Sequence, residues 1–147
     1  MWLQNFSVAE FLFLYLLMDM VTATTEGVKV SVETFYQEEY SGIAGGEFVF
    51  AYRITIENKG TSSVKLLRRH WHIFDSINDW KEVEGEGVVG EQPVIEPGGL
   101  HQYISGCSLR STSGKMFGTY LMERQDNELL FEVAIPEFKL ITPFLLN

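Results

Sequence analysis

Apolar and polar residues alternate with a period of two from Gly27 onward. Val28, Val30 and Val32 are separated by polar residues, and the same alternation runs from residue 48 to residue 56. Successive side chains of a β-strand point to opposite faces of its sheet, so this pattern predicts strands that are buried on one face. Further strands are predicted at residues 64–74, 80–84, 100–109, 115–123 and 129–135.

Turn-forming residues separate these segments. Gly, Pro, Asn, Asp and Ser favour turns, and they cluster at residues 41–46, 58–60, 76–79, 97–99 and 125–127. No convincing amphipathic helix follows residue 20. About seven or more short strands joined by turns predict an all-β protein with an antiparallel β-sandwich, and a β-barrel is the alternative.

The first 19 residues have a different character. Residues 11–18 form an unbroken apolar run, which is far shorter than the ~20 residues that a membrane-spanning helix needs. A secretory signal would carry Lys or Arg before such a run, but Glu10 precedes it and Asp19 follows it. We therefore expect this segment not to span a membrane.

Three interpretations of the N-terminal segment stay open: a secretory signal, a helix that docks on the core, and a stretch that lies upstream of the true start of translation. The third is favoured, because translation could begin at Met18 or Met20, just before the predicted strands. We accordingly divide the chain into an N-terminal extension, residues 1–19, and one domain, residues 20–147.

The composition fits one small domain. A chain of 147 residues that is 46% hydrophobic has enough apolar side chains to fill one core. Its net charge of -9 repels phosphate backbones, so nucleic acid is not an expected partner. The single cysteine, Cys107, cannot form an internal disulfide, which favours a reducing cytoplasm. We expect Cys107 to be a buried small residue rather than a nucleophile.

Two segments carry a family signature. Residues 68–75 read RRHWHIFD and residues 85–93 read GEGVVGEQP. Both resemble the ApaG family, which implies an immunoglobulin-like or fibronectin-type-III-like sandwich. The turn at residues 78–80 lacks the usual glycine, but Asn78 tolerates the left-handed conformation that such a turn requires. Further similarities follow in the family's order at residues 52–58, 96–99, 103–106, 114–120 and 134–138.

The resemblance also implies a role in binding. In larger proteins a similar domain is an appended adaptor, as in F-box proteins and in a protein that interacts with DNA polymerase delta. The family is also loosely associated with cobalt resistance and magnesium efflux. That association implies instead a module that binds phosphate-bearing metabolites, such as nucleotides or pyrophosphate, or a divalent cation such as Mg²⁺.

Residues 85–90 spell G-x-G-x-x-G, which binds dinucleotides where it joins a strand to a helix. Pro93 and Pro97 prevent a helix from following, so a Rossmann site is excluded. The loop amides could still form an anion nest, but residues 75–96 hold seven acidic residues against the single Lys81. We therefore expect the glycines to form turns and bulges. The phosphate-binding alternative would use Gly85, Gly87, Gly90, Arg68, Arg69 and His70.

Residues of the predicted strand 64–74 divide between two faces. Arg68 and His70 share one face, and Arg69 and Trp71 share the other. We expect Trp71 in the core, because large aromatic side chains dominate the packing of a sandwich. The two arginines are expected to pair with the acidic loop, or alternatively to hold the phosphate or carboxylate of a ligand.

His70 and His72 form an H-x-H pair on one strand face, a spacing at which two imidazoles reach one zinc or copper ion. The local sequence offers no third ligand. The acidic loop, with Glu84 and Glu86, or the distant His101 would have to supply it. Satisfied or solvated histidines are the expected state, and a metal site is the alternative.

The sequence contains no nucleophile elbow, P-loop or H-E-x-x-H motif, so an enzyme is not expected. The leading hypothesis is a cytoplasmic, non-enzymatic interaction module without a required cofactor. It would engage a protein partner through strand edges or through the loop surface at residues 75–92. The alternative is weak binding of a phosphate-bearing small molecule or a divalent cation.

Overall fold

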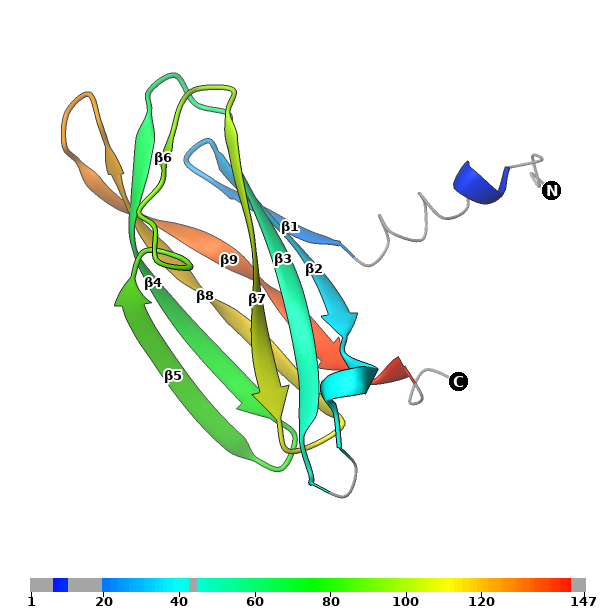
Figure 1. Cartoon of the computed structure of the whole chain (residues 1–147). Helices are drawn as coiled ribbons and strands as arrows, with labels where there is room; N and C mark the ends of the chain where they lie inside the picture. Colours follow the sequence, from blue (N-terminus) through cyan, green and yellow to red (C-terminus); the bar gives the residue numbers. More distant parts are fainter. Residues whose placement is uncertain (1–6, 11–19, 43–44, 144–147) are drawn as a thin grey trace.

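The computed structural model describes residues 7–10, 20–42 and 45–143. Two antiparallel sheets pack face to face as a β-sandwich, which confirms the predicted fold (Figure 1). One sheet has the strand order β1-β2-β3-β7, and the other has the order β5-β4-β8-β9 with the short β6 beside β4. The strands are β1 (Val21–Thr25), β2 (Val28–Tyr36), β3 (Phe48–Asn58), β4 (Val64–Asp75), β5 (Asp79–Glu86), β6 (Val94–Ile95), β7 (Leu100–Leu109), β8 (Ser113–Arg124) and β9 (Leu130–Ile141), and a 3-10 helix, η1 (Glu38–Tyr40), follows β2.

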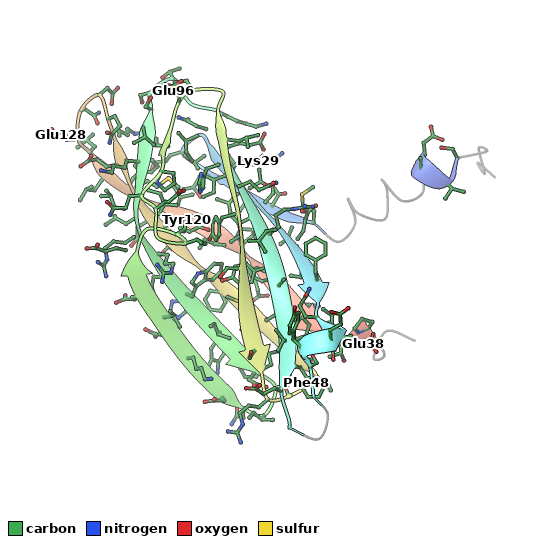
Figure 2. All side chains as sticks on the ribbon, in the orientation of Figure 1. Lys29, Glu38, Phe48, Glu96, Tyr120 and Glu128 are labelled. Carbon is green, nitrogen blue, oxygen red and sulfur yellow. The ribbon has the colours of Figure 1, made fainter. Side chains whose placement is uncertain are left out.

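The core lies between the two sheets and follows the alternation in the sequence. Every second residue of β3 is buried, and the residues between them are partly exposed. Trp71 of β4 is 3% exposed, and its ring centroid lies 5.5 Å from that of Tyr52 and 5.9 Å from that of Phe138. The prediction that Trp71 belongs to the core is confirmed. Tyr120 of β8 is fully buried in the same layer, between the two sheets (Figure 2).

The last strand, β9, is longer than the sequence pattern predicts. The pattern ends the strand at residue 135, just before a proline, but β9 continues to Ile141. The register against β8 shifts at this point, so that Pro136 and Glu137 lie opposite the single Phe117. Proline lacks an amide hydrogen, and a β-bulge of this kind tolerates it inside a strand.

The strands predicted from the alternation include neither β1, which precedes Gly27, nor β6, which is only two residues long. β1 joins β2 through a tight turn in which Glu26 and Gly27 have φ values of 47° and 84°. β6 contributes two residues, which pair with the start of β4. The turn between β4 and β5 follows the prediction, since Asn78 has a φ of 69° and therefore adopts the left-handed conformation.

The sandwich is closed along one side and open along the other. On the closed side, the amide of Ala134 in β9 donates a hydrogen bond of 3.1 Å to Oγ1 of Thr25 in β1. The other ends of the two sheets are β5 and β7. Among the described strands, β5 is hydrogen-bonded only to β4 and β7 only to β3. Each of these two strands therefore presents a free backbone edge.

The described part of the chain contains no helix that is long and apolar enough to cross a membrane. The apolar run at residues 11–18 lies outside the described residues, so the division between an N-terminal extension and a domain stays a prediction.

Residues 1–17 are expected to be dispensable for folding, because their apolar run has no partner of matching period and β1 begins only at Val21. A chain that starts at Met20 should keep its free energy of unfolding to within about 1 kcal/mol of a total of about 5–15 kcal/mol. Thermal melting of the two chains measures the difference. A loss of several kcal/mol on truncation would show instead that the segment docks on the core.

Candidate functional site

A cleft of about 350 Å³ separates β5 from β7 on the open side of the sandwich. Three apolar side chains form its exposed rim: Val83 of β5 is 41% exposed, Val89 of the following loop 64%, and Ile104 of β7 60%. Trp71 and Met116 of the core form its floor. We call this hollow the β5–β7 cleft. Exposed apolar groups gathered around a concave apolar floor are typical of a binding surface.

Tyrosine hydroxyls add polar groups to the wall of the β5–β7 cleft. Tyr52 and Tyr103 both line it, and the hydroxyl of Tyr103 is hydrogen-bonded to that of Tyr120 behind it. Burial raises the pKa of Tyr103 and of Tyr120, so both hydroxyls stay protonated at neutral pH. Tyr103 of β7 and Tyr120 of β8 belong to different sheets, so the packing of the two sheets brings these hydroxyls together.

Arg69 reaches from β4 to the glycine-rich loop. Its Nη1 donates hydrogen bonds to the carbonyl oxygens of Glu86 at 2.9 Å and of Gly87 at 3.0 Å. The guanidinium lies against Gly85, where a Cβ would come within 2.7 Å of Nη2. Arg68 is exposed and occupies the register position opposite Glu86. The predicted division of the two arginines between opposite faces is confirmed.

The glycine-rich loop is a tight turn. The amide of Val88 donates to the carbonyl of Glu91 at 2.8 Å, and the amide of Glu91 donates to the carbonyl of Val88 at 3.1 Å. Val89 and Gly90 between them have φ values of 47° and 77°, as in a two-residue hairpin turn. Gly87 has a φ of 61° and donates its amide to the carbonyl of residue 67. The expectation that these glycines form turns is confirmed, while the phosphate site stays a prediction.

Histidines and carboxylates meet on the outer face of the sheet that contains β4. Nε2 of His70 lies 3.3 Å from Oε2 of Glu82, and Nδ1 of His70 lies 3.2 Å from Oε1 of Glu84. Nδ1 of His72 lies 3.7 Å from Oε1 of Glu82. The structure therefore brings together three of the four residues that the sequence suggested for a metal, His70, His72 and Glu84.

Glu86 and the alternative ligand His101, which the sequence also suggested for a metal, lie elsewhere, and Glu82 was not predicted as a ligand. Glu86 lies opposite Arg68 in the register rather than opposite a histidine. His101 belongs to the other sheet, where its Nε2 lies 4.0 Å from Oε2 of Glu91. Residues 82–84 read E-x-E. Pairing this segment with H-x-H at residues 70–72, in the register that the hairpin turn sets, would have predicted Glu82 as a ligand.

Aromatic rings continue the outer face beyond the histidines. The ring of His72 stacks on Phe117 of β8, with 5.0 Å between centroids and 14° between planes. Trp80 of β5 packs on Phe74 at 4.7 Å and meets Phe117 edge-on at 6.2 Å. The stacking restricts the ring of His72, and with it the position of the imidazole nitrogens.

Cys107 is only partly buried on β7, so its burial is less complete than the sequence suggested. Desolvation raises the pKa of its thiol to about 11. The thiol is therefore protonated at neutral pH, and a protonated thiol is a poor nucleophile. This agrees with the expectation that Cys107 is not a reactive cysteine.

Asp75 belongs by sequence to the acidic loop surface expected at residues 75–92, but it is a buried carboxylate at the end of β4, 7% exposed. It accepts a hydrogen bond of 2.6 Å from the amide of Arg110 and a second one from the hydroxyl of Ser111. These bonds tie the β4–β5 hairpin to the turn between β7 and β8. Asp75 therefore positions the two edge strands that flank the β5–β7 cleft.

Comparisons with known proteins agree with this architecture. A family model described as "ApaG domain" matches residues 38–124. Protein ApaG of Paramagnetospirillum magneticum is 48% identical over 124 residues, which are 84% of this chain and 95% of that protein. Protein ApaG of Sinorhizobium fredii is 46% identical over 128 residues, 87% of this chain and 98% of that protein. The crystal structure of a putative ApaA protein from Bordetella pertussis has a TM-score of 0.76 at 41% identity and covers 79% of this chain and 94% of its own.

Proposed function

This chain belongs to the ApaG family, and we propose that its domain is a non-enzymatic interaction module that binds an extended segment of a protein partner at the β5–β7 cleft. The observation that carries the proposal is the open side of the sandwich, where exposed apolar side chains surround a hollow between two free strand edges. The single Cys107, which forms no internal disulfide, fits the cytoplasm as the place where the module works.

β7 is the edge that best suits a partner strand. Proteins usually protect a long edge strand with charged residues or proline, because its unpaired amides and carbonyls attract other chains. The ten residues of β7, Leu100–Leu109, include no Asp, Glu, Lys, Arg or Pro. An extended segment that pairs with β7 would gain backbone hydrogen bonds and would place every second side chain towards the cleft.

The charge around the β5–β7 cleft favours a basic partner segment. β5 carries the exposed carboxylates of Glu82, Glu84 and Glu86 on the outer face of its sheet, beside the cleft rather than in it, and the loop after β5 adds that of Glu91. Lys81 is the single basic residue of this stretch. Such a field attracts a positively charged segment and repels an acidic one. We therefore expect a segment in which an apolar anchor for the cleft alternates with Lys or Arg.

The phosphate-binding alternative finds less support. Arg69 does turn towards the glycine-rich loop, but its Nη1 donates to two carbonyl oxygens there. Carbonyl oxygens at this position would repel a phosphate. Three loop amides, those of Gly87, Val88 and Glu91, are already donated to backbone carbonyls. An anion nest would need such amides to be free.

Selection of peptides displayed on phage against the purified full chain tests the interaction module. We expect enriched peptides that alternate apolar residues with Lys or Arg. Ile104→Asp should weaken the binding of a selected peptide at least tenfold, which corresponds to about 1.4 kcal/mol, because the new carboxylate would lose solvation against the bound apolar side chain. Fluorescence anisotropy with the labelled peptide measures the affinity.

Leu130→Asp is the matched control, because Leu130 is 57% exposed, nearly as much as Ile104, and lies at the start of β9 rather than at the cleft. It should leave the affinity unchanged. Selected peptides that are acidic, or that bind Ile104→Asp and the native chain equally well, would overturn the proposal. A stable dimer of the native chain that Ile104→Asp dissociates would show instead that the edge holds a second copy.

A further inference from the structure

One group of side chains on the outer face has the composition and spacing of a transition-metal site. His70, His72 and Glu82 each offer one ligand atom, and these atoms all lie within 4.8 Å of one another. We call these three residues the His70–His72–Glu82 cluster. All three are at least partly accessible to solvent, and they face away from the β5–β7 cleft. The cluster is therefore separate from the apolar rim of the cleft, although Glu82 and Glu84 also belong to the acidic surface invoked for the proposed interaction module.

Two paired strands, rather than a mobile loop, hold the cluster. The period of a strand places His70 and His72 on the same face of β4, with 4.5 Å between ring centroids. The antiparallel register places Glu82 of β5 opposite His72. The stacking of His72 on Phe117 fixes one imidazole further. Ligands carried by regular strands are held near their binding positions before an ion arrives.

The separations in the cluster fit tetrahedral coordination. Metal–ligand bonds of about 2.0–2.1 Å around a tetrahedral zinc ion place neighbouring ligand atoms roughly 3.3 Å apart. Oε2 of Glu82 lies 3.3 Å from Nε2 of His70, and the other oxygen, Oε1, lies 3.7 Å from Nδ1 of His72. One ligand atom from each residue lies within 4.8 Å of the others, so the side chains would have to draw together by up to about 1.5 Å to share one tetrahedral ion.

Glu84 supplies a second feature that metal sites commonly have. Its Oε1 lies 3.2 Å from Nδ1 of His70, the ring nitrogen that faces away from Glu82. In the structure Nε2 of His70 is hydrogen-bonded to Glu82; with a metal ion bound at Nε2, the ring proton would lie on Nδ1, beside the carboxylate of Glu84. Carboxylates that orient a metal-binding histidine in this way also make its nitrogen a better ligand.

We propose that His70, His72 and Glu82 bind a divalent transition-metal ion, with Glu84 as the residue that orients His70. Two imidazole nitrogens and one carboxylate oxygen suit Zn²⁺, Co²⁺, Ni²⁺ or Cu²⁺. Mg²⁺ and Ca²⁺ prefer oxygen ligands throughout, so they are not the expected ions. Three protein ligands leave one tetrahedral position for water or for a donor atom of a partner.

Titration of the full chain without a histidine tag tests the site. Isothermal calorimetry should detect one Zn²⁺ per chain, and Co²⁺ should give the visible absorption of a tetrahedral complex with nitrogen ligands. His70→Ala, His72→Ala and Glu82→Ala should each weaken binding on the order of 100-fold or more, since loss of an orienting partner alone costs about 10–100-fold. Glu84→Ala should fall within that smaller range.

His101→Ala is the matched control, because it removes a histidine that lies beside the carboxylate of Glu91 on the other sheet. It should leave the affinity for Zn²⁺ unchanged. Thermal melting without metal should show that all variants fold, since the mutated side chains are not part of the core. The proposal would be overturned by absence of stoichiometric Zn²⁺ binding, by equal affinity in the native chain and the His70→Ala and His72→Ala variants, or by Mg²⁺ that displaces Co²⁺ at similar concentration.

Discussion

Replacing Trp71 by alanine is expected to lower the free energy of unfolding by about 3–5 kcal/mol, the usual cost of removing a large buried aromatic side chain. Trp71 packs edge-on against Tyr52 and Phe138, and it forms part of the floor of the β5–β7 cleft. The cavity left behind would lie between the two sheets, where neighbouring rings cannot collapse into it without moving strands. Since small domains are stable by about 5–15 kcal/mol in total, the loss takes a large share of the stability and should lower the melting temperature clearly.

Trp80→Ala is the matched control for this prediction. Trp80 lies on the neighbouring strand β5 but is 54% exposed, and surface substitutions usually change stability by about 0.5 kcal/mol or less. Some loss beyond that is expected, because Trp80 packs on Phe74. Urea titration followed by circular dichroism gives both values. If Trp71→Ala were nearly as stable as the native chain but failed to bind a selected peptide, Trp71 would be a binding residue rather than a core residue.

Much of the fold follows from the sequence because burial in a sandwich repeats every two residues. The alternation is unbroken along β3, and β2 buries Val28, Val30 and Val32 as predicted, although Ser31 between them is buried as well. In β4 the pattern slips between Leu66 and Arg68, where a bulge shifts the register against β8. Because of this bulge, the next inward-facing residue after Leu66 is Arg69. The charged side chain of Arg69 therefore reaches the β5–β7 cleft, although a regular alternation along the strand would not place it there.

The candidate sites depend on contacts between strands, which the pattern of a single strand does not contain. H-x-H is visible in the sequence, but the third ligand atom comes from Glu82, which meets the histidines only through the register of the β4–β5 hairpin. That register depends on the turn at Asn78, which holds a left-handed conformation without glycine. The β5–β7 cleft is still less visible, because it lies between two strands that are not paired with each other.

Gly87→Ala is expected to destabilise the domain by about 2–5 kcal/mol, the sum of about 1–2 kcal/mol for a left-handed residue with a side chain and about 1–3 kcal/mol for overpacking. Gly87 has a φ of 61°, and a Cβ there would lie 2.1 Å from the carbonyl oxygen of Glu91, so the turn would have to open. Gly90→Ala is the control, because Gly90 has a φ of 77° but no atom within 4 Å of a Cβ, and it should lose only about 1–2 kcal/mol. Urea titration measures both losses of stability. Titration of the native chain with pyrophosphate should give at best a dissociation constant on the order of 0.1–1 mM. A micromolar constant that Gly87→Ala abolishes while the stability stays unchanged would show that this glycine serves a phosphate site rather than the turn.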